Sequence, residues 1–312
     1  MSTFVLKGLD GGNPLGFLAA LGVLRTSALG VGPTTAMHWV HAEGGWRPWV
    51  TLPGKIDAET WVADLHATLK TMDEHPALTL GNNLNLPCGE FRDAAVKARQ
   101  HASMEDRRFA DFIAAYGSEA VETELNGKKT GVIRDTALRT MSGAGHQHFL
   151  GSMRAFVADT TPEHLHKALF ESWRYDDSLE GHTMRWDPLD DVRYALRWCN
   201  PSGDPDRKKG GSMWGANRLA IEALPLFPTA PVGTTLETTG FRLKKREGVF
   251  WTWPLWETPL TLDPLRSLVA LGELQTDEPN RDRLASMGIV EVMRCQRITQ
   301  GKFRNFSMTW ST

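Results

Sequence analysis

The hydrophobic pattern near the N-terminus predicts a buried helix followed by a β-hairpin. Asn13 is a typical N-cap residue, and Pro14 suits the first helical position, where its missing N–H costs nothing. The apolar residues that follow recur at helical spacing: Leu15, Phe17, Leu18, Leu21 and Leu24. Residues 36–52 alternate around Glu43-Gly44-Gly45, which is the pattern of two strands joined by a tight turn.

Further helices and hairpins are predicted along the rest of the chain. The predicted helices cover residues 58–72 after Asp57, 92–102, 105–115, 148–158, 162–173 after Thr161, a segment that begins after Asp187, 216–227 ended by Pro225, 264–274 after Asp263, and 281–287. Strands are expected around the turns at 126–127 and 245–248, over 132–141, and over 289–310. We therefore expect an α+β protein of mixed helices and antiparallel hairpins. It forms one continuous two-lobed body, with an N-terminal lobe over residues 1–130 and a C-terminal lobe over 131–312.

The composition is that of a soluble globular protein with reduced thiols. Of 312 residues, 41% are hydrophobic and 23% are charged, which suffices for a sizeable core. Three cysteines (Cys88, Cys199 and Cys295) are odd in number and far apart, which favours free thiols over disulfides or a zinc site. The N-terminus lacks the pattern of a signal peptide, and the apolar run over 15–24 is too short to span a bilayer. We expect a cytoplasmic protein without membrane contact.

The glycine-rich turn before the first helix resembles a phosphate-binding loop only superficially. A Walker loop needs a Lys followed by Ser or Thr at the helix mouth, where this chain has Asn13, Pro14 and Leu15. Gly8, Gly11 and Gly12 also have the wrong spacing for a dinucleotide-binding fingerprint. We interpret the turn as a fold signature and predict no cofactor.

Catalytic constellations are not apparent in the sequence. His146 and His148 form a His-x-His pair, but a metal needs further ligands, which the spacing does not name. One alternative therefore stays open: a metal-dependent phosphodiesterase in which both histidines and a distant carboxylate such as Asp176 hold the ion. We favour a noncatalytic protein.

Basic clusters are the strongest functional signal in the sequence. With a net charge of −2 the chain as a whole does not attract nucleic acid, so any such contact has to come from local basic patches. From Arg281 to Thr312 the chain has six Lys or Arg against two acids. Basic side chains on loops beside glycines suit contacts to phosphates without sequence readout, although solvated loops look the same. The candidate nucleic-acid-binding residues are Arg207, Lys208, Lys209, Lys244, Lys245, Arg246, Arg294, Arg297, Lys302 and Arg304.

Tryptophan is unusually frequent, with 12 residues against 3 tyrosines, which is typical of packed cores and of interfaces. Trp251, Trp253 and Trp256 lie within six residues and are candidates for partner binding. The alternative is that they fill the core beneath their hairpin, which we favour for most of them. Exposed tryptophans of this kind would suit a structural adaptor.

Several segments in order along the chain together resemble a family of CRISPR-associated proteins. These segments are "GLDGGNPLGFLAALGVLR" (8–25), "HFLGSMRAF" (148–156), "ESWRYDD" (171–177), "MRWDPLDDVRYALRWCNPS" (184–202), "GANRLAIEALPLFPTAP" (215–231) and "FWTWPLWETPLTLDPLRSLVAL" (250–271). They are similar to the extension family of type I-G (formerly I-U) loci, which accompanies the helicase-nuclease and is related in role to Cascade large-subunit-like proteins.

The resemblance implies a noncatalytic subunit of an RNA-guided DNA-targeting complex used in antiviral defence. In such complexes guide pairing reads the sequence, while proteins hold backbones and recognise a short flanking motif. The implied partners are other type I-G effector subunits, guide RNA, target DNA and the separate helicase-nuclease that cuts. The resemblance carries no catalytic residues to this chain, so the candidate site depends on the basic clusters.

Overall fold

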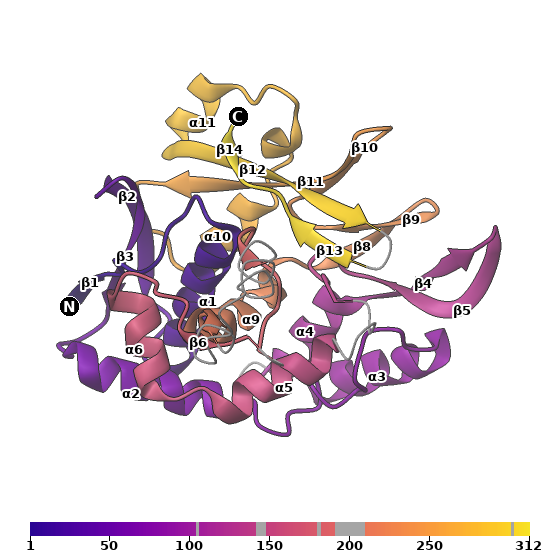
Figure 1. The fold of residues 1–312 in the computed structure, drawn as a ribbon, viewed down its shortest axis with the longest axis horizontal. Coiled ribbons are helices and arrows are strands. Elements are labelled where there is room, and N and C mark those ends of the chain that lie inside the picture. The colour runs from indigo at the N-terminus through magenta and orange to yellow at the C-terminus, as the bar shows by residue number, and fades with distance from the viewer. Residues whose placement is uncertain (104–105, 142–147, 180–181, 191–209, 301–302) are drawn as a thin grey trace, which may run out of the picture.

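A computed structural model describes residues 1–103, 106–141, 148–179, 182–190, 210–300 and 303–312. Antiparallel sheets lie over a layer of helices, with the C-terminal strands at the top of the molecule and most helices below (Figure 1). The structure confirms a mixed α+β fold with antiparallel sheets in a single body. Among the described residues, no helix has the length and apolar character needed to cross a membrane.

The N-terminal elements follow the predicted pattern closely. A three-stranded antiparallel sheet has the order β1-β3-β2, and α1 follows β1; the bounds are β1 Ser2–Val5, α1 Pro14–Gly30, β2 Ala36–Ala42 and β3 Gly45–Leu52. The Asn13 side chain caps α1 by accepting from Leu15 N–H at 2.8 Å. Glu43 and Gly44 both have positive φ angles, as a tight hairpin turn requires.

The middle of the chain supplies most of the helices and three short two-stranded sheets. The helices are α2 Ala58–Lys70, α3 Cys88–His101, α4 Arg108–Tyr116, α5 Phe149–Asp159, α6 Pro162–Phe170, α9 Trp214–Ile221 and the 3₁₀ turn η2 Leu224–Leu226. The paired strands are β4 Gly117–Leu125 with β5 Lys128–Asp135, β6 Asp177–Ser178 with β7 Gly210–Ser212, and β8 Thr229–Val232 with β9 Thr235–Thr238. The helix expected after Asp187 extends beyond the described residues.

The C-terminal sheet has the order β10-β11-β12-β13, and β14 also pairs with β12. Its elements are β10 Phe241–Lys244, β11 Gly248–Trp256, α10 Leu262–Val269, η3 Gly272–Gln275, α11 Arg281–Ser286, β12 Ile289–Gln300, β13 Phe303–Phe306 and β14 Trp310–Ser311. The prediction that Asp263 caps α10 is wrong, because the helix begins at Leu262, two residues before the predicted start, and Thr261 occupies the N-cap position.

One hydrophobic core joins elements from both ends of the chain. Helix α1 is buried all round over Pro14 to Ser27, and it packs against α9. The two helices approach so closely that a Cβ at Gly22 would lie 1.8 Å from the carbonyl oxygen of Leu219. The predicted lobe boundary at residue 130 falls within β5, and elements on both sides of it share this core.

The glycine-rich turn over residues 8–12 links the N-terminal sheet, through β3, to the C-terminal sheet, through β11. Asp10 accepts hydrogen bonds from Gly12 N–H at 2.9 Å and Trp46 N–H at 3.1 Å, and Trp253 donates from its indole to the Gly11 carbonyl at 2.9 Å. The turn therefore acts in packing and chain direction, in agreement with its interpretation as a fold signature.

Candidate nucleic-acid interface

The register of the C-terminal sheet divides its arginines between two faces. Directly paired residues in antiparallel strands face the same side, and side chains alternate along each strand. Arg297 pairs with Phe306, and Thr299 pairs with Arg304, so Arg297 and Arg304 share the inner face. Arg294 lies on the outer face, because it is three residues from Arg297.

At the end of the inner face, Arg297 and Arg304 meet two arginines from β5 and the segment after it. We call Arg134, Arg139, Arg297 and Arg304 the arginine cluster. Arg139 pairs with Asp135, and its Nε donates to the Met141 carbonyl at 2.7 Å. Arg297 donates to the carbonyl of Arg139 at 2.7 Å, which joins β12 to residue 139 across 158 positions of sequence.

Among the residues that the structure describes, the arginine cluster has four positive groups and one interacting carboxylate, Asp135. Burial lowers the pKa of Arg297 to about 10, and the charges of Arg304, Arg139 and Arg134 contribute in the same direction. Burial also lowers the pKa of Arg304, opposed by Asp135 and assisted by the other two arginines. The folded protein therefore holds these positive charges at an electrostatic cost.

Some donors of the cluster lack partners among the described residues. The buried Arg297 Nε has no hydrogen-bond acceptor, and the half-buried Arg304 guanidinium makes no hydrogen bond or ion pair with any described residue. Guanidinium groups present paired N–H donors that match phosphate oxygens. The arrangement suits an anion such as a phosphate, whose charge would relieve the mutual repulsion of the arginines.

Arg294 was predicted to contact nucleic acid, and the structure assigns it a different contact set. Its side chain is 4% exposed and donates to Thr252 Oγ1 at 2.9 Å and to the Thr276 carbonyl at 2.6 Å. A third contact at 3.2 Å reaches the carbonyl of Leu274. Arg294 thus fastens the segment around η3 to β12 and offers no free surface.

The predicted hairpin tip lies between β10 and β11. Lys244 forms an ion pair with Asp277, and its Nζ lies 5.1 Å from the centre of the Phe250 ring. Lys245 and Arg246 are exposed, and neither forms a hydrogen bond or an ion pair with a described residue. Two of the three predicted cations therefore remain available to a ligand.

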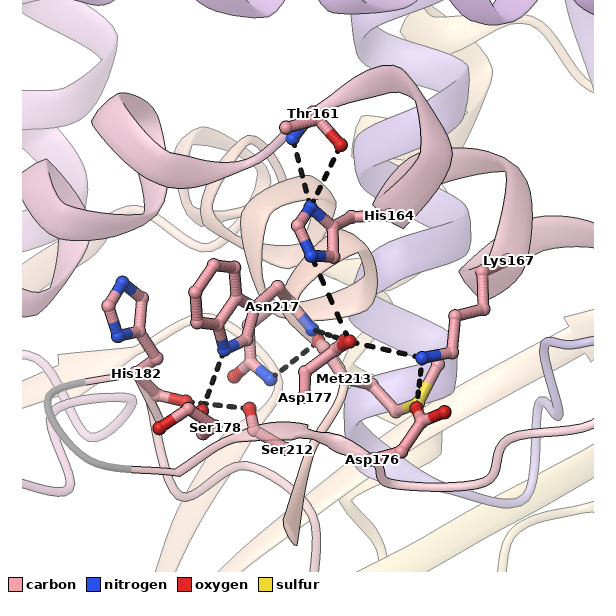
Figure 2. Close-up of polar contacts among 11 residues, drawn as sticks. Thr161, His164, Lys167, Asp176, Asp177, Ser178, His182, Ser212, Met213 and Asn217 are labelled. Atoms are coloured by element: carbon pink, nitrogen blue, oxygen red, sulfur yellow. Dashed lines mark hydrogen bonds and ion pairs between the residues drawn. The ribbon is translucent and has the colours of Figure 1, made fainter. Parts of the chain in front are cut away.

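Arg207, Lys208, Lys209 and Lys302 lie outside the described residues. From Gly210 on, β7 pairs with β6, and Figure 2 shows polar side-chain contacts around Asp177, Ser178 and Ser212 of these strands. Asp177 accepts from the backbone of Trp214 at 2.8 Å and from Lys167 at 3.1 Å, at the start of α9.

The same network has several further contacts. Trp214 donates from its indole to the Ser178 carbonyl at 2.7 Å, and Ser212 donates to the His182 carbonyl at 2.6 Å. His164 accepts from the Thr161 backbone at 3.1 Å and completes the predicted cap of α6 (Figure 2). These contacts fix β6, β7 and α9 to one another.

The three tryptophans proposed for partner binding are core residues. Trp251 and Trp253 are 0% exposed and Trp256 is 1% exposed, so the structure corrects their assignment to a partner surface. Trp251 lies in an aromatic cluster with Phe241 and Phe306, and Trp256 donates to the Met37 carbonyl at 2.7 Å. The core alternative therefore holds for all three.

The residues of the metal alternative have other contacts where they are described. His148 lies 3.1 Å from the Asn83 amide, and Asp176 pairs with Lys167 (Figure 2). His146 lies outside the described residues. No cluster of three or more His, Cys, Asp or Glu side chains suited to a metal occurs in the described part of the chain.

Sequence reasoning missed Arg134 and Arg139. Both sit in a segment that was expected to be a strand over 132–141, whereas β5 ends at Asp135 and the following residues turn toward the C-terminal sheet. In the sequence these are two arginines five positions apart with Asp135 between them. That spacing is common, and it points to a site only once the contact from Arg297 to residue 139 is known.

No protein-family model matches this chain, and no curated protein matches it.

Proposed function

We propose that this protein is a noncatalytic subunit of an RNA-guided DNA-targeting complex, of the type I-G kind that its sequence resembles, and that the arginine cluster contacts a nucleic-acid backbone. The observation that carries this proposal is the group of four guanidiniums with one interacting carboxylate, Asp135, in the described part of the chain. Phosphate contacts supply most of the affinity of sequence-independent binding. A subunit that leaves sequence readout to guide pairing needs contacts of this kind.

Two features of the cluster support a ligand role over a purely structural one. The Arg304 guanidinium makes no hydrogen bond or ion pair with a described residue, and the repulsion within the cluster is a cost to the folded chain. A structural site would be expected to satisfy its donors, as Arg294 does with three backbone carbonyls and a hydroxyl.

The test measures binding of a fluorescein-labelled DNA duplex across a salt series. We expect Arg304→Gln to make the salt dependence shallower by about 0.9 in log–log slope for the lost phosphate contact. The matched control is Arg99→Gln, which removes the same charge from an exposed position on α3. Equal slopes for Arg304→Gln, Arg99→Gln and the unchanged protein would contradict the proposed interface.

Membership of a complex is tested separately by co-expression with the other products of a type I-G locus. An affinity tag on another subunit should retain this chain, and the retained complex should bind target DNA in a manner that depends on Arg304. If the chain is retained while Arg304→Gln leaves DNA binding unchanged, the adaptor alternative replaces the nucleic-acid role. If the chain is not retained, the assignment to this complex is wrong.

A further inference from the structure

The outer face of the C-terminal sheet carries a solvent-accessible aromatic pair. Phe250 pairs with Arg242 of β10 and with Gln296 of β12, so the three side chains share one face. Two residues along the strands, Arg294 pairs with Thr252 on one side and with Trp310 on the other, and these side chains lie on the same face. Trp310 is 42% exposed, and its ring lies edge-on to Phe250 with centroids 6.2 Å apart. The residues from η3 onward cover Arg294 in the middle of this face and leave Trp310 accessible.

Cations border this aromatic pair on the β10–β11 side. Arg242 and Lys244 project from β10 on the same face, and Lys245 and Arg246 continue to the hairpin tip. Asp277 pairs with Lys244, and Glu247 is the acid of the tip. Four cations against these two acids leave the border positive, although the whole chain is slightly negative.

From this arrangement we propose that the outer face binds a short stretch of single-stranded DNA, with one base stacked on Trp310 and the flanking phosphates on the β10–β11 cations. An aromatic ring on an open sheet face beside basic side chains is how proteins bind unpaired bases. In a duplex the base faces are already stacked on one another, so an exposed ring has no such face to contact.

Charge selects the occupant of this surface. A protein partner that covered Trp310 would also have to accommodate the exposed side chains of Lys245 and Arg246, which form no hydrogen bond or ion pair with described residues. A polyanion accommodates both features at once. The choice of DNA rests on the proposed function, which places this chain beside opened target DNA, while the stacking geometry is independent of the arginine cluster.

The test uses fluorescence anisotropy of the full chain with a labelled oligothymidylate, an oligouridylate and a DNA duplex. Trp310→Ala should weaken oligothymidylate binding roughly 5- to 150-fold, the range expected for losing one stacked base. Trp310→Phe should retain most of the affinity because it keeps an aromatic face. Duplex binding should change little in either variant.

Leu243→Ala is the matched control, since Leu243 is 67% exposed on β10 and faces the opposite side from Phe250. The proposal is overturned if Trp310→Ala binds oligothymidylate as the unchanged protein does, or if Leu243→Ala weakens binding as much. Binding of oligouridylate alone would replace DNA with RNA as the occupant. Loss of duplex binding in Arg304→Gln with intact stacking at Trp310, or the reverse, separates failure of the arginine cluster from failure of this surface.

Discussion

Two groups of arginines in this protein have different electrostatic surroundings. In the core, Arg25 of α1 and Arg218 of α9 share the carboxylate of Glu222 at 2.6 and 2.9 Å, and all three side chains are at most 4% exposed. Arg218 also donates to the Leu69 carbonyl at 2.8 Å. In the arginine cluster, by contrast, Arg304 lacks a described partner and Arg297 keeps a buried donor unsatisfied.

A structural arginine and one available to a ligand differ in the charges that surround them. Burial would raise the pKa of Glu222, but the charges of Arg218 and Arg25 outweigh it and lower that pKa. The two arginines therefore stabilise the carboxylate of Glu222, and Glu222 favours the charged form of Arg25 against the effect of burial. In the arginine cluster the described charges around Arg297 are mostly those of other arginines, which is why we propose an external anion as their partner.

The largest expected effect comes from breaking the core triad with Glu222→Gln. Removing one member of a buried ion pair leaves an uncompensated charge and costs about 3–5 kcal/mol. We expect urea denaturation to show a loss of this size, with Glu124→Gln, an exposed carboxylate on β4, unchanged as the control.

The pH dependence gives a second readout for Glu222. Its pKa is lower in the folded state than the ordinary value of 4.5, so its stabilisation is present above that value and is lost as the pH falls through the folded pKa. The unfolding free energy of the unchanged protein should therefore fall on acidification more steeply than that of Glu222→Gln. Parallel pH profiles would show that Glu222 carries no coupled charge.

A somewhat smaller effect is expected from Gly22→Ala, which tests the approach of α1 to α9 that brings Arg25 to Glu222. The new Cβ would lie 1.8 Å from the Leu219 carbonyl oxygen, so backbone must move. We expect a loss of about 3 kcal/mol in urea denaturation, at the upper end for overpacking. Gly89→Ala on α3 is the control, because a Cβ there meets nothing within 4 Å. Equal stabilities of the two variants would contradict the close approach.

The sequence predicted helix caps and turns better than it predicted which strands pair and which side chains are buried. Asn13, Asp57 and Thr161 were identified as helix caps because capping depends on residues only a few positions away. Burial of Trp251 and exposure of Trp310 could not be separated in the same way. Their difference depends on which sheet face meets the core, and that is set by strand pairing with β12.

The candidate site was predicted in part for the same reason. Arg297 and Arg304 were found from local basic composition, which also selected Arg294 although it is held by backbone carbonyls. Arg134 and Arg139 became significant only when the contact from Arg297 to residue 139 joined distant segments. Composition finds cations, whereas their partners are fixed by tertiary contacts.

Asp135→Asn tests the carboxylate that pairs with Arg139 in the arginine cluster. Its side chain is 13% exposed and that of Arg139 is 7% exposed, so the loss of the pair should cost roughly 1–3 kcal/mol of unfolding free energy. Duplex DNA should bind more tightly at low salt, because the cluster becomes more positive. Asp93→Asn, an exposed change on α3, should alter neither quantity. Weaker DNA binding by a folded Asp135→Asn would contradict an anion site at this cluster.

The smallest expected effect has the opposite sign and separates the two arginine groups most sharply. Burial and the charges of Arg139 and Arg134 lower the pKa of Arg304, although Asp135 opposes them, so the charged side chain is disfavoured by folding at neutral pH. Arg304→Gln should therefore leave the unliganded protein slightly more stable, by about 0.5 kcal/mol, within the range of weakly buried charge interactions. The gain should shrink as salt is added, because salt screens repulsion between partly exposed charges. Urea denaturation at low and high salt measures both, beside Arg99→Gln. A loss above about 1 kcal/mol would place Arg304 with the structural arginines of the core triad.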